Sequence, residues 1–351
     1  MFLSDLDFKI PEKLIALKPT KPRDSSNLVI VRENLEIIKF KELVKCLNPG
    51  DAIIFNDTKV IPGLLNGKIN NRKVTVNLNK VIDKKKIIWN VLIKSNRSPK
   101  KNDIINFNDK LNAKITNEIF ENNFKSFNIK FFCEYENFKE RLHSIGKIPL
   151  PPYILKKRKI HKFDSKDYQT IFAEKEGAVA SPTASLHFTK KLINNLKNKG
   201  IKLINITLHV NGGTFLPIKS ENVFDHKMHC EFGVISQKAA NEINKIRKSG
   251  GKIFAVGTTV LRLLESSKDS KGHIKSFTGE TNIFLKPGTK INSVDALITN
   301  FHTPRSTLLL LIFAILGKKR TLELYRFAIK KKLRFFSYGD ACLIWIGNGK
   351  I

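Results

Sequence analysis

An α/β unit is encoded in the stretch Lys252-Ile253-Phe254-Ala255-Val256-Gly257-Thr258-Thr259-Val260-Leu261-Arg262. Its first half is an uninterrupted apolar run, which favours a buried strand, and Gly257 supplies a tight turn after it. The hydroxyl groups of Thr258 and Thr259 can cap the helix that follows. The segment therefore predicts a strand, a turn and a helix, the repeating unit of an α/β sheet.

The chain repeats this alternation of strands and helices on both sides of residue 252. Gly200 and the pair Gly250-Gly251 stand where two of the expected helices end, as is common at helix carboxyl ends. Short apolar runs bounded by polar residues, glycine or proline predict further strands. The expected helices cover 190–198, 237–248 and about 260–266, and the expected strands cover 28–31, 52–55, 202–210 and 253–256.

Between Leu64 and about Tyr135 the sequence pattern changes to short stretches of alternating polar and apolar residues, separated by polar turns. This pattern favours a small all-β barrel or sandwich. The proline-rich segment 146–153 cannot continue a helix or a central strand, and it marks the return to the α/β pattern. We therefore expect a discontinuous α/β domain, 1–62 and 147–351, interrupted by a β-barrel domain at 63–146.

The charge balance indicates a class of partner. The chain has 351 residues, and Lys+Arg 63 against Asp+Glu 31 gives a formal net charge of +32. Such an excess attracts polyanions, of which RNA and DNA are the obvious examples. Lysine accounts for 51 of the basic residues and arginine for 12, so a compositional bias that places solvated lysines over the surface is the alternative explanation.

The first residues, the longest apolar run and the cysteines indicate where in the cell the protein is expected. Residues 1–7 carry acids where a secretory signal carries basic residues. The apolar run Leu308 to Leu316 is about half the roughly 20 residues that span a bilayer, so it predicts a buried helix. The four cysteines, at 46, 133, 230 and 342, form no CxxC pair for a zinc or redox site. We expect a cytoplasmic protein with no membrane partner.

The segment Asp225-His226-Lys227-Met228-His229-Cys230-Glu231 holds two imidazoles and two carboxylates. Such a cluster suits general acid–base catalysis near neutral pH, or metal binding. Surface histidines paired with nearby acids explain the same pattern, so the sequence leaves both explanations open.

Glycines and other small residues mark two segments where a ligand or a second backbone could approach closely. Gly212 and Gly213 follow a strand in 208–215, although a tight turn accounts for them equally well. Residues 177–188 lead through small side chains to a helix start, for which tight packing is the alternative, and 297–304 run from a strand into a polar loop.

Charged ligands are suggested at two more places. The backbone N–H groups after Gly257, with Arg262 one turn on, can hold a phosphate or carboxylate, unless this is an ordinary capped turn. The segment Arg334-Phe335-Phe336-Ser337-Tyr338-Gly339-Asp340 sets three aromatic rings beside a carboxylate, so it could receive a sulfonium or ammonium group or belong to the core. The sequence has no GxGxxG or GxxxxGK[ST] pattern, which disfavours a dehydrogenase or a P-loop nucleotidase.

Taken together and in this order, these segments resemble the bacterial S-adenosylmethionine:tRNA ribosyltransferase-isomerase family of queuosine biosynthesis. The resemblance starts at Leu6-Asp7-Phe8 and 11–16, continues through 55–62 and 149–154, and then includes the glycine-rich and histidine-rich segments described above. It covers essentially the whole chain. It implies a Rossmann-like α/β domain interrupted by a smaller β-barrel.

The resemblance also implies a reaction. The ribosyl part of S-adenosylmethionine is transferred to the aminomethyl group of a 7-deazaguanine base (preQ1) at the anticodon wobble position of tRNA. The sugar rearranges to an epoxycyclopentanediol, giving epoxyqueuosine-tRNA, adenine and methionine. S-adenosylmethionine is then a consumed cosubstrate, no recycled cofactor or metal is implied, and the family suggests a monomer. Two alternatives stay open: a non-catalytic tRNA-binding protein, and a metal-dependent hydrolase that uses His226, His229 and Glu231.

The implied chemistry assigns an expected role to each candidate residue. A base must remove a proton from the carbon next to the sulfonium, and we expect His229 to be that base, with His226 and Glu231 as orienting or relay partners. We expect Asp340 and Tyr338 near the sulfonium or the ribose, and Arg262, Thr258 and Thr259 at the methionine carboxylate. Gly212, Gly213 and Thr183 are expected to surround the adenosine. His187 and His302 are further candidates for protonating adenine.

The sequence departs from the usual family pattern at several positions. Asn211 and Ser185 stand where glycine is usual, which narrows the space for close backbone approach. Lys59 stands where arginine is usual, and it keeps the charge but loses the planar fork.

Overall fold

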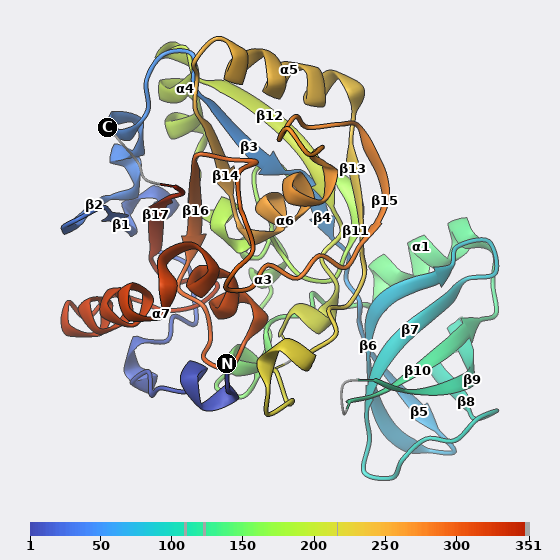
Figure 1. Ribbon diagram of the computed structural model, residues 1–351. Helices are drawn as coiled ribbons and strands as arrows, with labels where there is room; N and C mark the ends of the chain where they lie inside the picture. The colour runs from blue at the N-terminus through green and yellow to red at the C-terminus, as the bar shows by residue number, and fades with distance from the viewer. Residues whose placement is uncertain (109–110, 122–123, 216, 348–351) are drawn as a thin grey trace.

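Four parallel strands form the centre of a nine-stranded sheet in the computed structural model (Figure 1). The structure describes residues 1–108, 111–121, 124–215 and 217–347. The predicted apolar runs of the α/β part all form strands, which confirms the predicted fold class. In sheet order the four central strands are β12 (Lys202–Leu208), β3 (Ala52–Asn56), β14 (Ile253–Val256) and β16 (Ala296–Asn300).

Further strands extend this sheet at both edges, and all of these pairings are antiparallel except the parallel pairing of β17 with β1. On one side β12 is followed by β13 (Glu231–Ile235) and β15 (Phe277–Thr281). On the other side β16 is followed by β17 (Ala341–Trp345), β1 (Asn27–Val31) and β2 (Leu35–Lys39). The sheet is therefore mixed, with a parallel centre.

Helices cover the sheet, and their ends follow the capping chemistry of the sequence. The side chains of Thr189 and Ser236 accept hydrogen bonds from the first turns of α4 and α5, which is why these helices begin where the sequence predicts them. The helices are α1 (Tyr135–Ile145), α2 (Pro152–Leu155), α3 (Asp164–Asp167), α4 (Lys190–Asn198), α5 (Gln237–Lys248), α6 (Thr258–Ser267) and α7 (Thr307–Lys330).

The apolar run at 308–316 forms the first half of α7, as predicted. Residues Leu309 to Phe313 are buried against the sheet, and Gly317 interrupts the helix with a non-helical backbone. In the part of the chain that the structure describes, no helix is both long and apolar enough to cross a membrane.

The region of alternating sequence forms a closed six-stranded barrel beside the α/β part (Figure 1). All barrel pairings are antiparallel. The sequence left a barrel or a sandwich open, and the structure is a barrel. Its strands are β5 (Leu64–Ile69), β6 (Arg72–Asp83), β7 (Ile88–Lys94), β8 (Ile104–Asn108), β9 (Leu111–Glu121) and β10 (Phe124–Phe131).

Two short strands outside the barrel pair with each other. β4 (Thr58–Val60) precedes the barrel, and β11 (Lys175–Ala178) lies parallel to it after the barrel has been completed. The helix α1, which the sequence pattern did not predict, packs Phe138 and Leu142 against the barrel core. The division into domains at 62–63 and 146–147 stays a prediction.

The sheet topology brings the candidate site segments to one edge. The carboxyl ends of β12, β14 and β16 lead into Asn211, Gly257 and His302, and the carboxyl ends of parallel strands meet at one edge. Because β13 runs antiparallel to β12, with Leu208 opposite Gly233, its first residues lie at this same edge. His229 and Glu231 are thereby placed beside the strand ends where an α/β sheet binds ligands.

Candidate active site

Two neighbouring pockets lie at this edge of the sheet, and Leu308 of α7 lines both. Pocket A is lined by His226, His229, Glu231 and Arg262, among other residues. Pocket B is lined by Thr183, Thr258, Thr259 and His302, among other residues. The structure thus divides most of the predicted site residues between two adjacent cavities.

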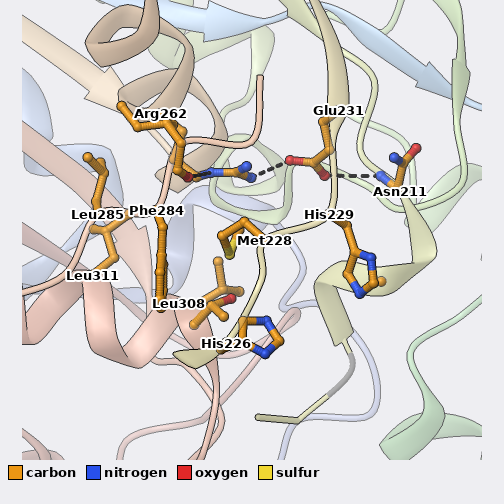
Figure 2. A pocket seen from close by; sticks show the side chains of 13 residues that line it. Asn211, His226, Met228, His229, Glu231, Arg262, Phe284, Leu285, Leu308 and Leu311 are labelled. Carbon is orange, nitrogen blue, oxygen red and sulfur yellow. Dashed lines mark hydrogen bonds and ion pairs between the residues drawn. The ribbon is translucent and has the colours of Figure 1, made fainter. Parts of the chain in front are cut away.

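The polar wall of pocket A is a buried ion pair between α6 and the start of β13 (Figure 2). Arg262 Nη1 donates to Glu231 Oε2, and both side chains are almost completely buried. Glu231 Oε1 also accepts from the backbone N–H of Asn211 at 3.1 Å. The Arg262 Nη2 atom, in contrast, is buried without a hydrogen-bond partner among the described residues, so the guanidinium keeps a donor for a ligand.

Two imidazoles face the same cavity (Figure 2). The rings of His226 and His229 lie 6.5 Å apart, nearly perpendicular to each other. Burial, and secondly the neighbouring His229, lowers the pKa of His226, so its ring is neutral at physiological pH. The Nε2 atom of His229 is buried and has no hydrogen-bond partner in the described part of the chain. A neutral, unpartnered imidazole nitrogen can accept a proton from a ligand.

Gly213 fixes the position of the His229 ring. A Cβ atom on Gly213 would lie 2.7 Å from His229 Cδ2, closer than real Cβ contacts come. Gly213 is therefore a close-approach glycine that lets the imidazole pack on the backbone. Gly212 lies against Asn79 of the barrel instead and lines neither pocket.

Pocket B is built around the first turn of α6. Gly257 takes φ 92°, a left-handed conformation that glycine adopts readily, and the helix begins directly after it at Thr258. The hydroxyls of Thr259 and Ser181 line the pocket, buried and without hydrogen-bond partners among the described residues. The residues predicted to bind an anion together are therefore divided between the pockets: Thr258 and Thr259 line pocket B, and Arg262 lines pocket A.

A hydrogen-bonded chain of fixed polarity supports the wall of pocket B. Thr183 Oγ1 donates to Asn300 Oδ1 at 3.1 Å. The Asn300 amide nitrogen is only a donor, and it lies 3.2 Å from His187 Nε2. The other ring nitrogen of a neutral His187 then donates to Ser26 Oγ at 2.7 Å. Thr183 consequently presents its oxygen lone pairs to the pocket as a hydrogen-bond acceptor.

The two histidines of this region are neutral. Burial is the main cause that lowers the pKa of His187 to about 3, with Arg334 and Arg23 adding repulsion. Burial also lowers the pKa of His302 to about 3. His302 lines pocket B and meets Thr299 Oγ1 at 2.9 Å, whereas His187 lies behind Asn300 and lines neither pocket A nor pocket B.

Asp340 and Tyr338 do not line either pocket. The Asp340 carboxylate is fully buried, and it accepts hydrogen bonds from the backbone and side chain of Asn27 and from the backbone of Arg334. Tyr338 borders a smaller cavity that includes Arg23 and His187. The structure therefore keeps both residues out of pockets A and B, with Tyr338 near His187. The hydrogen bonds of Asp340 hold the 334–340 loop.

The sequence matches a known family over almost its whole length. The family described as "Queuosine biosynthesis protein" matches residues 3–344. The chain belongs to this family. Relatives named S-adenosylmethionine:tRNA ribosyltransferase-isomerase include a Zymomonas mobilis protein, 43% identical over 96% of this chain and 97% of that protein. The Halothermothrix orenii protein of the same name is 43% identical over 98% of this chain and 100% of that one.

A solved structure extends the match to the fold of the queuosine biosynthesis family. The crystal structure of an S-adenosylmethionine tRNA ribosyltransferase from Thermotoga maritima aligns with a TM-score of 0.53 and 29% identity. The alignment covers 97% of this chain and 99% of that one. The similarity therefore includes the barrel as well as the α/β part.

Sequence reasoning missed several residues of this queuosine biosynthesis protein's site. Phe284 lines pocket A with its ring 5.9 Å from that of His226, and Asn300 joins Thr183 to His187. Asn300 stands in a segment already singled out, so its position at the end of an apolar strand was a usable signal. No such signal marked Phe284, which lies in the connection after β15.

The geometry does not support a metal-dependent hydrolase. Within the described ranges, no group of three or more histidine, cysteine, aspartate or glutamate side chains is placed to hold a metal ion.

Proposed function

We propose that this chain transfers and isomerises the ribosyl part of S-adenosylmethionine onto the aminomethyl group of preQ1 in tRNA, with release of adenine and methionine. The family membership supports the activity. The observation that carries the assignment of the site is pocket A, next to pocket B, in which His229 Nε2 and Arg262 Nη2 are both buried without hydrogen-bond partners among the described residues. S-adenosylmethionine is a consumed cosubstrate, and tRNA is the acceptor.

The hydrogen count of the reaction requires a base. Each ring carbon of an epoxycyclopentanediol carries one hydrogen, whereas the 5′ carbon of S-adenosylmethionine carries two. One C–H bond at that carbon must therefore break, and the adjacent sulfonium makes its hydrogen acidic. The departing adenine takes up a proton and the attacking amine gives one up, so the overall reaction releases one proton. A protein group that accepts and returns protons suits every step.

We assign the base to His229, and His226 and Glu231 to its support. His229 lines the cavity, and its buried Nε2 has no hydrogen-bond partner among the described residues. Burial, and secondly the neighbouring His229, lowers the pKa of His226, so the His226 ring stays neutral beside the assigned base. Burial lowers the pKa of His187 and of His302 to about 3, so neither ring is an imidazolium that could protonate adenine at neutral pH.

The two pockets suit the two halves of S-adenosylmethionine. The methionine end is a zwitterion, and its carboxylate and ammonium groups match Arg262 and Glu231 in pocket A. The ring of Phe284 in the same pocket offers an aromatic face to the sulfonium. The adenosine then occupies pocket B, where Thr183 and Asn300 offer an acceptor and an amide, and Thr259 and Ser181 offer hydroxyls.

The acceptor is proposed to be tRNA with preQ1 at the anticodon wobble position, bound by a monomer in the cytoplasm. The net charge of +32 supports binding of a polyanion. The barrel beside the α/β part offers a second surface for the RNA (Figure 1).

One incubation tests this function against the two alternatives. Purified protein is mixed with S-adenosylmethionine and preQ1-containing tRNA, with and without EDTA, and the released bases and the digested tRNA are analysed by mass spectrometry. We expect adenine release that requires the tRNA and is unaffected by EDTA. tRNA binding without adenine release would favour a non-catalytic binding protein, and loss of activity in EDTA would favour a metal-dependent hydrolase.

Variants of two histidines test the assigned base. His229→Gln should lower turnover about 10²–10⁴-fold, the usual contribution of a positioned acid–base group. His273→Gln is the matched control, because His273 is 62% exposed and pairs only at the surface with Asp269. A His229→Gln variant that turns over within a few-fold of the parent would show that another group is the base.

A further inference from the structure

Asn79 lies at a β-bulge of the barrel, and its side chain contacts Gly213 in the loop that follows β12. Asn79 lies in β6, and the pairing of β6 with β7 shifts register between Leu78 and Lys80. A bulge inserts an extra residue into one strand and re-aims its side chain. At this position the Asn79 side chain leaves the barrel ladder and points to the loop that follows β12.

The Asn79 amide is held in one orientation by its partners. Its Oδ1 accepts from the backbone N–H of Gly213 at 3.2 Å, and its Nδ2 donates to Asn90 Oδ1 at 2.8 Å. The Asn90 amide in turn donates to Ser126 Oγ at 3.0 Å and to Asn128 Oδ1 at 3.3 Å. Because each donor and acceptor is matched, the Asn79 oxygen faces Gly213 and cannot exchange places with its nitrogen.

Gly213 passes this constraint on to His229. Its α-carbon lies so close to the imidazole that a Cβ would be 2.7 Å from His229 Cδ2 and 3.3 Å from Nε2. A shift of the Gly213 backbone would therefore displace the ring or open a gap beside it. The next barrel residue, Lys80, forms an ion pair at 2.8 Å with Glu280 of β15, which holds β6 at the same place.

We propose that Asn79 is a positioning residue for His229, through which the inserted barrel sets the geometry of proton abstraction. The proposal rests on the proposed function only in naming His229 as the base. The contact runs from the Asn79 oxygen through the Gly213 amide to the ring of His229. It gives the barrel a direct part in catalysis, apart from any part in binding RNA.

Three variants test the role. Asn79→Ala removes the acceptor, and Asn79→Asp keeps an oxygen that can accept from Gly213. Asn106→Ala is the control, because Asn106 is an exposed asparagine of β8 in the same barrel. We expect Asn79→Ala to lower kcat about 10- to 100-fold, as a misplacement near 1 Å does, with the KM for S-adenosylmethionine within about two-fold. Asn79→Asp should recover part of the loss, because it keeps the acceptor for Gly213 but loses the donor to Asn90 Oδ1.

A readout that does not depend on turnover separates this proposal from the assignment of the base. In NMR spectra of the free protein, the ring signal of His229 should shift in Asn79→Ala and return toward its original place in Asn79→Asp. The His273 signal should stay where it is in every variant. An unmoved His229 signal, or an unchanged kcat in Asn79→Ala, would overturn the proposal. A normal rate in His229→Gln would instead overturn the assigned base and leave the signal shift to test the contact.

Discussion

Gly213 and His229 are in van der Waals contact through a backbone α-carbon and an imidazole edge, with no room for a methyl group between them. Gly213→Ala should therefore push the ring away and lower kcat about 10²-fold, with little effect on global unfolding. Gly279→Ala in β15 is the control, since the nearest atom to its added Cβ would lie 3.9 Å away. Equal turnover of the two variants in a steady-state assay would contradict the close-approach explanation.

The ion pair of Glu231 and Arg262 couples ligand binding to stability. Arg262→Met should lower the free energy of unfolding by about 3–5 kcal/mol, because a buried carboxylate loses its cation. The double variant Arg262→Met, Glu231→Gln should lose less of the free energy of unfolding than Arg262→Met alone, because it leaves no buried charge without its partner. Urea denaturation measures both, and calorimetry should find weaker S-adenosylmethionine binding in both. A double variant with restored binding would exclude the pair as the zwitterion site.

The buried His187 should make the protein sensitive to acid. Its pKa is about 3 in the folded protein against an ordinary 6.5, so between these values the unfolded chain binds more protons than the folded one. The stabilising contribution of the neutral ring is complete above pH 6.5 and is lost as the pH falls toward 3. Melting temperatures from pH 7.5 to 4.5 should fall more steeply in the parent than in His187→Gln. Parallel curves would mean that the ring is not held neutral.

Local sequence signals are enough to predict the helices and strands, whereas the site is assembled by pairing between strands that are distant in the sequence. Thr189, Ser236 and Gly257 sit at helix starts and act through their own side chains or backbone, so α4, α5 and β14-α6 could be predicted. The contact of Gly213 with His229 follows from the antiparallel pairing of β12 with β13, which local sequence patterns do not specify.

The sequence also could not predict the direction in which a side chain faces. The aromatic and acidic residues at 334–340 suggested a cation site, yet the Asp340 carboxylate points inward to Asn27 and the Arg334 backbone. Phe284, the aromatic ring that does line pocket A, has no charged motif around it. Composition alone could not distinguish these two settings.

The basic charge should be visible in RNA binding. Affinity for preQ1-containing tRNA should fall steeply between 50 and 200 mM salt, by about 10³-fold or more if six or more phosphates are contacted. S-adenosylmethionine binding should change little over the same range, because its site is buried. Filter binding and calorimetry give the two curves. A flat curve for tRNA would mean that the lysines are a compositional bias and not a binding surface.

The most direct test of proton removal next to the sulfonium uses S-adenosylmethionine with two deuterium atoms on the 5′ carbon. After turnover on preQ1-containing tRNA, mass spectrometry of the modified nucleoside counts the label. We predict that one deuterium stays in the transferred group, that the other leaves, and that adenine and methionine appear in equal amounts with the product. A transferred group that keeps both deuterium atoms would contradict the account, because it would show simple alkyl transfer without removal of a hydrogen.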